Sequence, residues 1–297
     1  MNGNAKVQAA RLSILSNATL VFLKLLVGAV SHSISIIAEA IHSGVDLIAA
    51  MIAFYAVRIS AQPPDEAHAY GHGKYENISG TVEALLIIVA AFVIGIESVK
   101  KLYHPVVLKA GLGVIVMLIS ALANLLVSAN LFKVAKATDS IALEADGHHL
   151  RLDVFTSLGI CLGLLAVYLA KGACPAVMYI DPVLGLLVAF WVGWIGLQLS
   201  HKAIGPLLDM QLPLSEVERI TEIIHSDERV VGFHKLRTRK SGAQRHVDVH
   251  LIVPGKMSLS DAHELAEEIE DKIRAEFDHV SVLTHVEPDD DVRLPKV

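Results

Sequence analysis

The chain has 297 residues, of which 53% are hydrophobic and 19% are charged, and its formal net charge is −6. This composition excludes a disordered chain, which needs low hydrophobicity and high charge, and it is more apolar than an ordinary soluble enzyme. Aromatic residues make up only 5% of the chain, so Ala, Val, Ile and Leu supply most of the apolar mass. This composition is typical of an integral membrane protein.

Six segments are each long enough to cross about 30 Å of hydrocarbon, which takes about 20 helical residues. In chain order they cover residues 12–31, 34–58, 78–99, 110–132, 148–170 and 182–203. The fourth contains no charged residue, whereas the second and the fifth each contain His and Asp. The predicted fold class is a membrane all-α bundle of six transmembrane helices, followed by a small α+β domain.

The loops between these segments differ in their Lys and Arg content. With the N-terminus inside, inner loops and flanks hold seven basic residues and outer loops hold four: Lys100, Lys101, Lys109 and Lys171. An excess of Lys and Arg marks cytoplasmic loops. Both termini are therefore expected in the cytoplasm.

Charge divides the chain into two predicted domains, a transmembrane domain at 1–208 and a cytoplasmic domain at 209–297. The first holds 12 acidic and 13 basic residues, and the second holds 19 acidic and 12 basic residues. A C-terminal domain this acidic gives no reason to expect nucleic-acid binding, which needs a basic surface.

Periodicity and turn residues predict five elements in the C-terminal domain. A helix capped by Ser260 is expected to place Leu265, Ile269 and Ile273 on one face. The turn Lys240–Ser241–Gly242 is expected to join the first two strands. In order, the predicted elements are the helix Leu214–Ser226, the strands Val230–Arg239 and Arg245–Val253, the helix Ser260–Phe277 and the strand Val280–Val286.

The second and fifth spans each carry a His followed four residues later by an Asp. These pairs are His42 with Asp46, and His149 with Asp153. Four helical residues turn about 400°, so each pair shares one face. Two such helices side by side would offer two nitrogens and two oxygens, which suits tetrahedral Zn²⁺. A helix–helix hydrogen bond is the simpler interpretation of one pair, but it leaves unexplained two Asp at membrane depth, each costing about 2.5–3.5 kcal/mol.

The loop after the second span contains a further group of potential ligands. Asp65, His68 and His72 lie within eight residues of a segment punctuated by Gly71 and Gly73. Their spacing is equally compatible with a solvated polar loop and with a metal site.

Seven histidines lie in the C-terminal domain. Ligands on separate strands and a helix can converge at the edge of a small sheet, where Glu287 could bridge two ions; a His-rich polar face is the alternative. Alternation along the second strand places His246, Asp248 and His250 on one face. The positions of His225 and His279 near element ends favour a purely structural role, and His246 is undecided.

Five segments resemble the cation diffusion facilitator family, specifically its bacterial zinc and ferrous-iron efflux branch. The resemblance covers nearly the whole chain, and the last two segments together with the paired HxxxD are its most specific part. The segments are Ser31–Asp46, Tyr70–Glu76, Glu144–Ser157, Tyr179–Gly185 and Phe233–Gly242.

This resemblance implies a homodimeric antiporter in the lipid bilayer of the cell inner membrane. It would export Zn²⁺ in exchange for protons, with Fe²⁺, Cd²⁺ or Mn²⁺ as alternative cargo. Its transport site would consist of His42, Asp46, His149 and Asp153. A loop site would use Asp65, His68 and His72. The C-terminal domain would be a metallochaperone-like αββαβ domain that also binds Zn²⁺ as a structural or regulatory ion, with the ligands His234, His250, His263, His285 and Glu287. A charge pair of Lys74 and Asp209 would interlock the two protomers.

Two residues depart from the family pattern. Relatives often carry Asp at the position of His42, and a His there resembles the more zinc-selective members. Asp is also common at the position of Glu287, so the longer side chain here would loosen that site.

Two other classes of protein are possible from the residues alone. An intramembrane metallohydrolase would need an open coordination position, a water and a general base, whereas four ligands fill a tetrahedron and no HExxH motif is present. A metal-sensing receptor would leave Asp46 and Asp153 without a role. We therefore expect a transporter and not an enzyme.

Overall fold

The computed structural model describes residues 2–31, 34–103, 112–170 and 179–289. The chain divides into two units, Met1–Ile204 and Gly205–Val297. The predicted domain boundary after residue 208 lies four residues further along the chain. The predicted outer-loop residues Lys109 and Lys171 lie outside the described residues.

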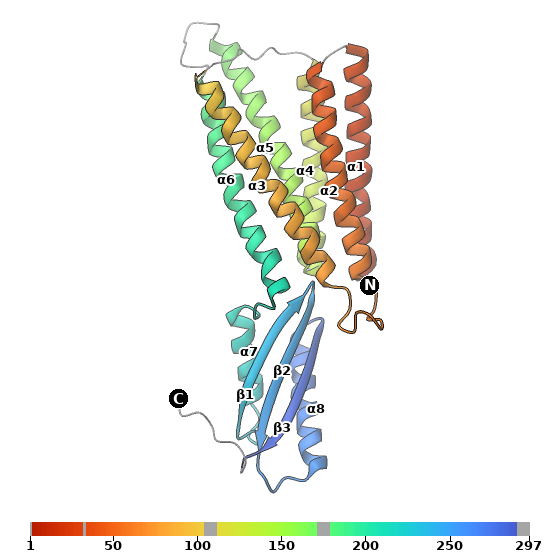
Figure 1. Ribbon diagram of the computed structural model, residues 1–297, viewed down its shortest axis with the longest axis vertical. Coiled ribbons are helices and arrows are strands. Elements are labelled where there is room, and N and C mark those ends of the chain that lie inside the picture. The colour runs from red at the N-terminus through yellow and green to blue at the C-terminus, as the bar shows by residue number, and fades with distance from the viewer. Residues whose placement is uncertain (1, 32–33, 104–111, 171–178, 290–297) are drawn as a thin grey trace. The chain divides into compact units, whose positions relative to one another are not determined.

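The N-terminal unit consists of long helices (Figure 1). Five of the six predicted spans each lie within one helix, and of the fourth, 110–132, residues 112–132 lie within α4 while 110 and 111 are outside the described residues. The helices are longer than the predicted spans. The helices are α1 (Asn2–Ser31), α2 (Ile34–Ser60), α3 (Lys74–Tyr103), α4 (Leu112–Thr138), α5 (Ile141–Ala170) and α6 (Ile180–Ile204).

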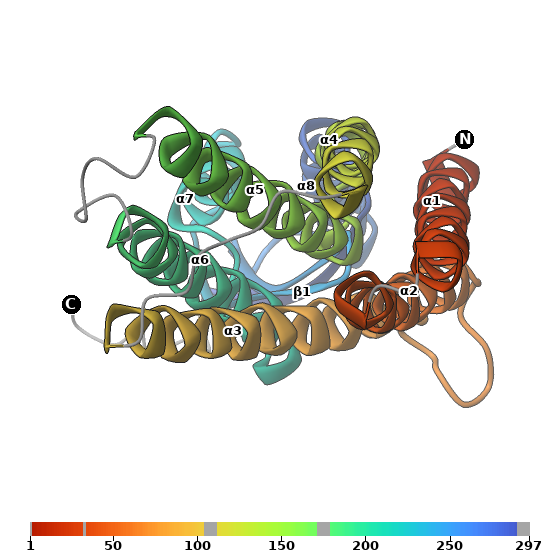
Figure 2. The same cartoon turned by 90° about the horizontal axis from the view of Figure 1, so that it is seen from above.

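These helices pack mainly as three pairs, α1 with α2, α4 with α5, and α3 with α6. Figure 2 shows the pairs from above, with α5 between α4 and α6. At Gly196 of α6 an added Cβ would lie 2.7 Å from the side chain of Ile88 on α3, so the glycine permits this close approach. Many large apolar side chains remain exposed, including Phe92 and Phe190, as expected of helices that face lipid.

Five of the helices contain segments long and apolar enough to cross a membrane, among the residues described. In α5 the side chains of residues 160–170 are not described, and its first half carries Glu144, Asp146, Arg151 and Asp153. Its 30 residues still suffice for a crossing, at about 1.5 Å per residue. A concentration of charge on one helix of an apolar bundle points to a functional role for that helix.

A buried ion pair ties several helices of this unit together. Nζ of Lys6 on α1 lies 2.8 Å from a carboxylate oxygen of Glu76 on α3, and Glu76 is only 1% exposed. Ser60 of α2 and Ser140, just before α5, also donate hydrogen bonds to this carboxylate. Glu76 therefore joins four segments at one end of the bundle.

The C-terminal unit has the predicted order αββαβ. After the short 3-10 helix η2 (Gly205–Leu208), its elements are α7 (Leu214–His225), β1 (Gly232–Ser241), β2 (Gln244–Val253), α8 (Leu259–Glu276) and β3 (Val280–Pro288). The sheet order is β1-β2-β3, with β1 and β2 antiparallel. Because β2 and β3 are parallel, the chain must cross over between them, and α8 forms this crossover.

Alternation along the strands produces the core of this unit. Val247, Val249 and Leu251 of β2 point to the helices, where Leu265 and Ile269 of α8 meet them. The intervening residues of β2, including His246 and His250, lie on the other face, as predicted. The predicted cap of α8 is wrong: Ser258, and not Ser260, accepts the hydrogen bond from the backbone of Asp261.

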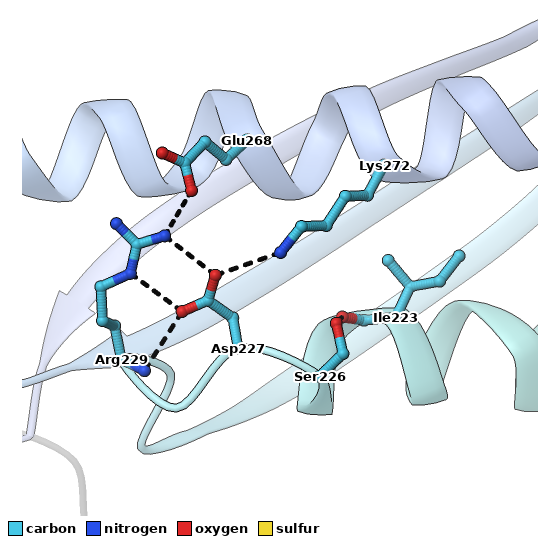
Figure 3. Close-up of polar contacts among 6 residues, drawn as sticks. All are labelled: Ile223, Ser226, Asp227, Arg229, Glu268 and Lys272. Carbon is cyan, nitrogen blue, oxygen red and sulfur yellow. Dashed lines mark hydrogen bonds and ion pairs between the residues drawn. The ribbon is translucent and has the colours of Figure 1, made fainter.

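A polar cluster fixes the turn between α7 and β1 against α8 (Figure 3). The Asp227 carboxylate accepts hydrogen bonds from Arg229 and from Lys272, the latter at 3.1 Å. Arg229 also contacts Glu268 of α8. The Arg229 guanidinium and the Lys272 ammonium hold the pKa of Asp227 well below its usual range.

Candidate metal centres

The first candidate centre lies between α2 and α5, where Asp46 is buried, Asp153 is half-buried and His42 is exposed. Donor atoms of His42, Asp46 and Asp153 lie within 4.8 Å of one another. Nε2 of His149 lies 3.0 Å from Oδ1 of Asp46, which brings the fourth predicted residue to the same place. Asp46 is 3% exposed and His149 is 6% exposed. The two HxxxD pairs thus meet, and their imidazole and carboxylate donors are those that Zn²⁺ uses.

One neighbour of this centre was missed by sequence reasoning. Nδ2 of Asn124 on α4 donates a hydrogen bond to Oδ2 of Asp153 at 3.1 Å. Such a contact orients a metal-binding carboxylate. The sequence shows only that Asn124 is a polar residue in an uncharged span, and no spacing to another polar residue marks it as a partner of Asp153.

Lys24 is a buried cation of α1 whose role the sequence does not predict. Its side chain reaches the first half of α2. Its ammonium is 2.7 Å from Oγ of Ser43 and 3.2 Å from a carboxylate oxygen of Glu39. Ser43 adjoins His42 in the chain. Lys24 therefore joins α1 to the segment of α2 that carries the candidate ligands, and it neutralises Glu39.

Two further carboxylates are buried in the same unit. Glu83 of α3 is 0% exposed, and neither of its oxygens has a hydrogen-bond partner among the described residues. Asp146 lies one turn before His149 on α5 and is 1% exposed. Together with Asp46 and Asp153, they make the interior of the bundle rich in acidic groups, as a path for cations requires.

The second candidate centre is the loop between α2 and α3. Oδ1 of Asp65 is 3.2 Å from Nδ1 of His68, and Oδ2 is 3.3 Å from Nε2 of His72. The donor atoms of all three lie within 4.8 Å of one another. The backbone N–H of His68 donates to the Asp65 carboxylate, and this bond, together with the two imidazoles, lowers the pKa of Asp65. Three ligands converge here, as a metal site requires.

The third candidate centre lies on the open face of the sheet in the C-terminal unit. Nδ1 of His250 is 2.6 Å from Oε1 of Glu287, and Nε2 of His234 is 3.0 Å from Oε2 of the same carboxylate. These three residues come from β2, β3 and β1, and their donor atoms lie within 4.8 Å of one another. The hydrogen bond from His250 lowers the pKa of Glu287, and His234 adds to the effect.

The register explains why these side chains meet. His234 pairs with His250 across β1 and β2, and His250 pairs with His285 across β2 and β3. A bulge follows His234, where Lys235 has φ of +52°. The three imidazoles therefore form a row, with centroids 5.2 Å and 4.7 Å apart. Two imidazoles and a carboxylate suit Zn²⁺, so the residues present fit a bound ion.

The other two predicted ligands differ in their placement. His285 lies at the edge of the cluster, with Nε2 3.7 Å from Oε1 of Glu287, and its side chain is exposed. His263 is exposed on α8, 3.5 Å from a carboxylate oxygen of Glu267 one turn further along. Because α8 covers the opposite face of the sheet, His263 is the one predicted ligand that lies away from the cluster within one chain.

The predicted interlock residues are Lys74, which begins α3, and Asp209, which follows η2. Asp209 accepts a hydrogen bond from Arg239 at 3.3 Å, and its φ is +54°.

A helical bundle with acidic and imidazole ligands in its interior, joined to a small α+β unit with its own His cluster, defines a membrane transporter of cations. The chain belongs to the cation efflux family, the cation diffusion facilitators. Residues 10–208 match the cation efflux transmembrane domain, and residues 212–289 match the cytoplasmic domain of cation efflux proteins. It is therefore a metal-transporting cation efflux protein.

Similar proteins cover the chain almost completely. An uncharacterized transporter of Synechocystis, sll1263, is 34% identical over 271 residues, which are 91% of this chain and 86% of that protein. The cation-efflux pump FieF of Shewanella oneidensis is 31% identical over 281 residues, 94% of this chain and 93% of that protein. The metal-bound C-terminal domain of the CzcD transporter from Thermotoga maritima is 31% identical, covering 27% of this chain and 94% of that one, with a TM-score of 0.26.

Proposed function

We propose that this protein exports Zn²⁺ from the cytoplasm across the cell inner membrane in exchange for protons, as a homodimer. The transported ion would bind to His42, Asp46, His149 and Asp153. The observation that carries this proposal is the convergence of the two HxxxD pairs, since the His149 imidazole lies 3.0 Å from the Asp46 carboxylate.

The chemistry of this site supports proton coupling. An imidazole must be deprotonated to bind a metal, and histidine has an ordinary pKa of about 6.5, so Zn²⁺ and H⁺ compete for the same nitrogens. Two carboxylates offset the charge of the ion at a depth where an unpaired cation is costly. Alternating exposure of the site to the two sides would then exchange one cation for the other.

The energetics limit the number of protons. Moving two positive charges outward against about 100 mV costs about 4.6 kcal/mol, and each proton moving inward returns about 2.3 kcal/mol. A pH difference of one unit adds about 1.4 kcal/mol per proton. One proton with a gradient of one pH unit therefore returns about 3.7 kcal/mol and drives the export of one Zn²⁺ only partway.

The donor set favours Zn²⁺ over harder ions. Two imidazoles with two carboxylates suit a tetrahedral borderline ion, whereas Mn²⁺ prefers all-oxygen ligands. Fe²⁺, Cd²⁺ and Mn²⁺ are the alternative cargo that the transport assay has to separate.

Uptake of metal into inside-out vesicles under an imposed pH gradient tests the proposal. The wild type should accumulate Zn²⁺ in proportion to the gradient, and Asp46→Ala should reduce uptake to the level of vesicles without the protein. Glu97→Gln is the matched control, because Glu97 is an exposed acid near the end of α3 that pairs with Lys100. Equal uptake by Asp46→Ala and the wild type would refute the assigned site.

The same vesicles test the coupling. Collapsing the pH gradient with a protonophore should stop accumulation, and a fluorescent dye inside the vesicles should report proton efflux as Zn²⁺ enters. Accumulation that persists without a gradient would exclude antiport. Parallel assays with Fe²⁺, Cd²⁺ and Mn²⁺ rank the cargo.

A further inference from the structure

Arg151 is a cation of α5 that has no role in the candidate metal centres or in the packing of the helices described above. Its side chain is exposed, and its guanidinium carbon lies 4.3 Å from the ring centroid of Phe132 on α4. Among the described residues, the contact found for this guanidinium is the ring. The guanidinium has five N–H donors, and a benzene ring satisfies none of them fully. Its donors are therefore available to an anion.

The depth of Arg151 follows from its contact with Phe132. Phe132 ends the uncharged run of α4, and Lys133 and Lys136 follow it. Uncharged runs end where the hydrocarbon gives way to the headgroups. The guanidinium over Phe132 thus lies at the level where phospholipid phosphates begin.

His148 lies beside Arg151 on the same face of α5. Its ring meets Phe132 edge-on, with centroids 4.8 Å apart. Gly147 makes room for the Phe132 ring, because a Cβ added to Gly147 would lie 3.2 Å from two carbons of that ring. Phe132 therefore holds both His148 and Arg151 at the border between α4 and α5.

These two residues form the polar end of an otherwise apolar pocket between α3, α5 and α6. The pocket has a volume of about 60 Å³, and its remaining walls are Ile87, Leu152, Phe155, Trp191, Val192 and Ile195. Phe155 and Trp191 pack edge to face, 4.7 Å apart between centroids. Trp191 is 45% exposed. The pocket thus presents donors at the level of the headgroups and an apolar surface deeper in the bundle.

We propose that this pocket binds an anionic phospholipid, with its phosphate on Arg151 and His148 and an acyl chain along Phe155 and Trp191. The arrangement matches the two ends of a lipid, and basic pockets between transmembrane helices bind anionic headgroups. A soluble anion would use the polar end only and leave Trp191 uncovered. The site is separate from the metal ligands, since Asp46 and His149 are buried inside the bundle.

Native mass spectrometry of the purified full-length protein in detergent tests the proposal, with phosphatidylglycerol and phosphatidylcholine as titrated lipids. The wild type should bind phosphatidylglycerol more tightly than phosphatidylcholine. Arg151→Gln should weaken phosphatidylglycerol binding about five- to tenfold, the effect of one basic residue at the membrane surface. Arg58→Gln, an exposed arginine in the last turn of α2, is the matched control and should leave binding unchanged.

Further measurements distinguish a lipid phosphate from free phosphate as the bound anion, and they show whether a loss of binding is due to misfolding of the variant. Excess inorganic phosphate should not displace the lipid, and Trp191→Ala should weaken binding of the lipid as well. Arg151→Lys keeps the charge and should retain most of the affinity if Arg151→Gln fails to fold. Equal losses in Arg151→Gln and Arg58→Gln, no loss in either, or displacement by phosphate would overturn the proposal.

Discussion

Nε2 of His149 lies 3.0 Å from Oδ1 of Asp46, although 103 residues separate the two in the chain. In the proposed transport site, each of these atoms would also bind the metal. The hydrogen bond and the metal would then exclude one another, and entry of a cation would separate the imidazole from the carboxylate.

The first prediction follows from this competition. Zinc binding should release protons, and the number released per ion should fall as the pH rises from about 6 to 8, because the imidazoles then carry fewer protons. Titration calorimetry in buffers of different ionisation enthalpy measures this number. His149→Gln should reduce the release at pH 6. An unchanged proton count in this variant would show that His149 takes no part in the exchange.

The second prediction concerns Asn124, which orients Asp153 through a hydrogen bond of 3.1 Å. Asn124→Leu keeps the approximate volume but removes the donor, and it should weaken the apparent zinc affinity in transport about tenfold, the lower end for contacts of this kind. Asn130→Leu on the same helix is the control. A similar change in both variants would indicate a general effect on α4 and no positioning of Asp153.

The third prediction concerns selectivity. His42→Asp replaces an imidazole with a carboxylate, which favours harder ions. Uptake of Mn²⁺ and Fe²⁺ relative to Zn²⁺ should rise severalfold, measured in the same vesicles with competing metals. His201→Asp, on an exposed position of α6, controls for the added charge. An unchanged ratio would mean that His42 does not set the preference.

The fourth prediction concerns the His cluster of the C-terminal domain, which we expect to sense cytoplasmic metal. A variant with both His234→Ala and His285→Ala should bind fewer zinc ions per chain in equilibrium dialysis, and the metal dependence of its transport should shift. His225→Ala is the control, because His225 contacts the backbone of its own helix and the ring of Phe233, away from the His cluster. Unchanged metal dependence in the double variant would rule out sensing.

The pH dependence of this cluster has a defined direction. The hydrogen bond from His250 lowers the pKa of Glu287, so the carboxylate stays ionised at neutral pH and its contribution is lost only in acid, below the ordinary glutamate pKa of about 4.3. An imidazole must be deprotonated to bind a metal, so zinc binding should weaken in acid before the Glu287 carboxylate is protonated, while the fold of the domain persists.

Much of the candidate site could be predicted because it depends on local periodicity. The four-residue spacing of His42 and Asp46 guarantees a shared helical face, and alternation along β2 places His250 away from the core. The contacts of Asn124 and Lys24 depend on which helices become neighbours, and no local pattern records that. The cap of α8 was wrong for a different reason, since Ser258 and Ser260 are both suitable residues and only the backbone angles decide between them.

The same distinction applies to His263. Its place on α8 was predictable from the helical period, but its distance from the sheet cluster depends on the face of the sheet that α8 covers. Because the apolar residues of β2 face α8, the polar face with His234 and His250 lies on the opposite side. His263 can meet those residues only if another chain supplies one of the partners, which makes its role a property of the proposed homodimer.

The last prediction concerns the stability of the C-terminal domain. Asp227 connects the turn after α7 to α8 by accepting hydrogen bonds from Arg229 and Lys272 (Figure 3). Asp227→Asn weakens both bonds and should lower the free energy of unfolding by about 1–3 kcal/mol, as expected for bonds to a charged group. Thermal unfolding of the full-length protein, followed by circular dichroism, measures the change. Asp271→Asn is the control, because Asp271 pairs with Arg274 on the exposed side of the same helix.

The pH dependence of this stabilisation follows from the lowered pKa of Asp227. A group whose pKa is lower in the folded state stabilises the fold above its unfolded pKa, about 3.9 for Asp, and the contribution is lost as the pH falls toward the folded value. The difference between the wild type and Asp227→Asn should therefore be constant from pH 5 to 8 and shrink below about pH 4. A difference that disappeared near neutrality instead would implicate a histidine, and the assignment to Asp227 would be wrong.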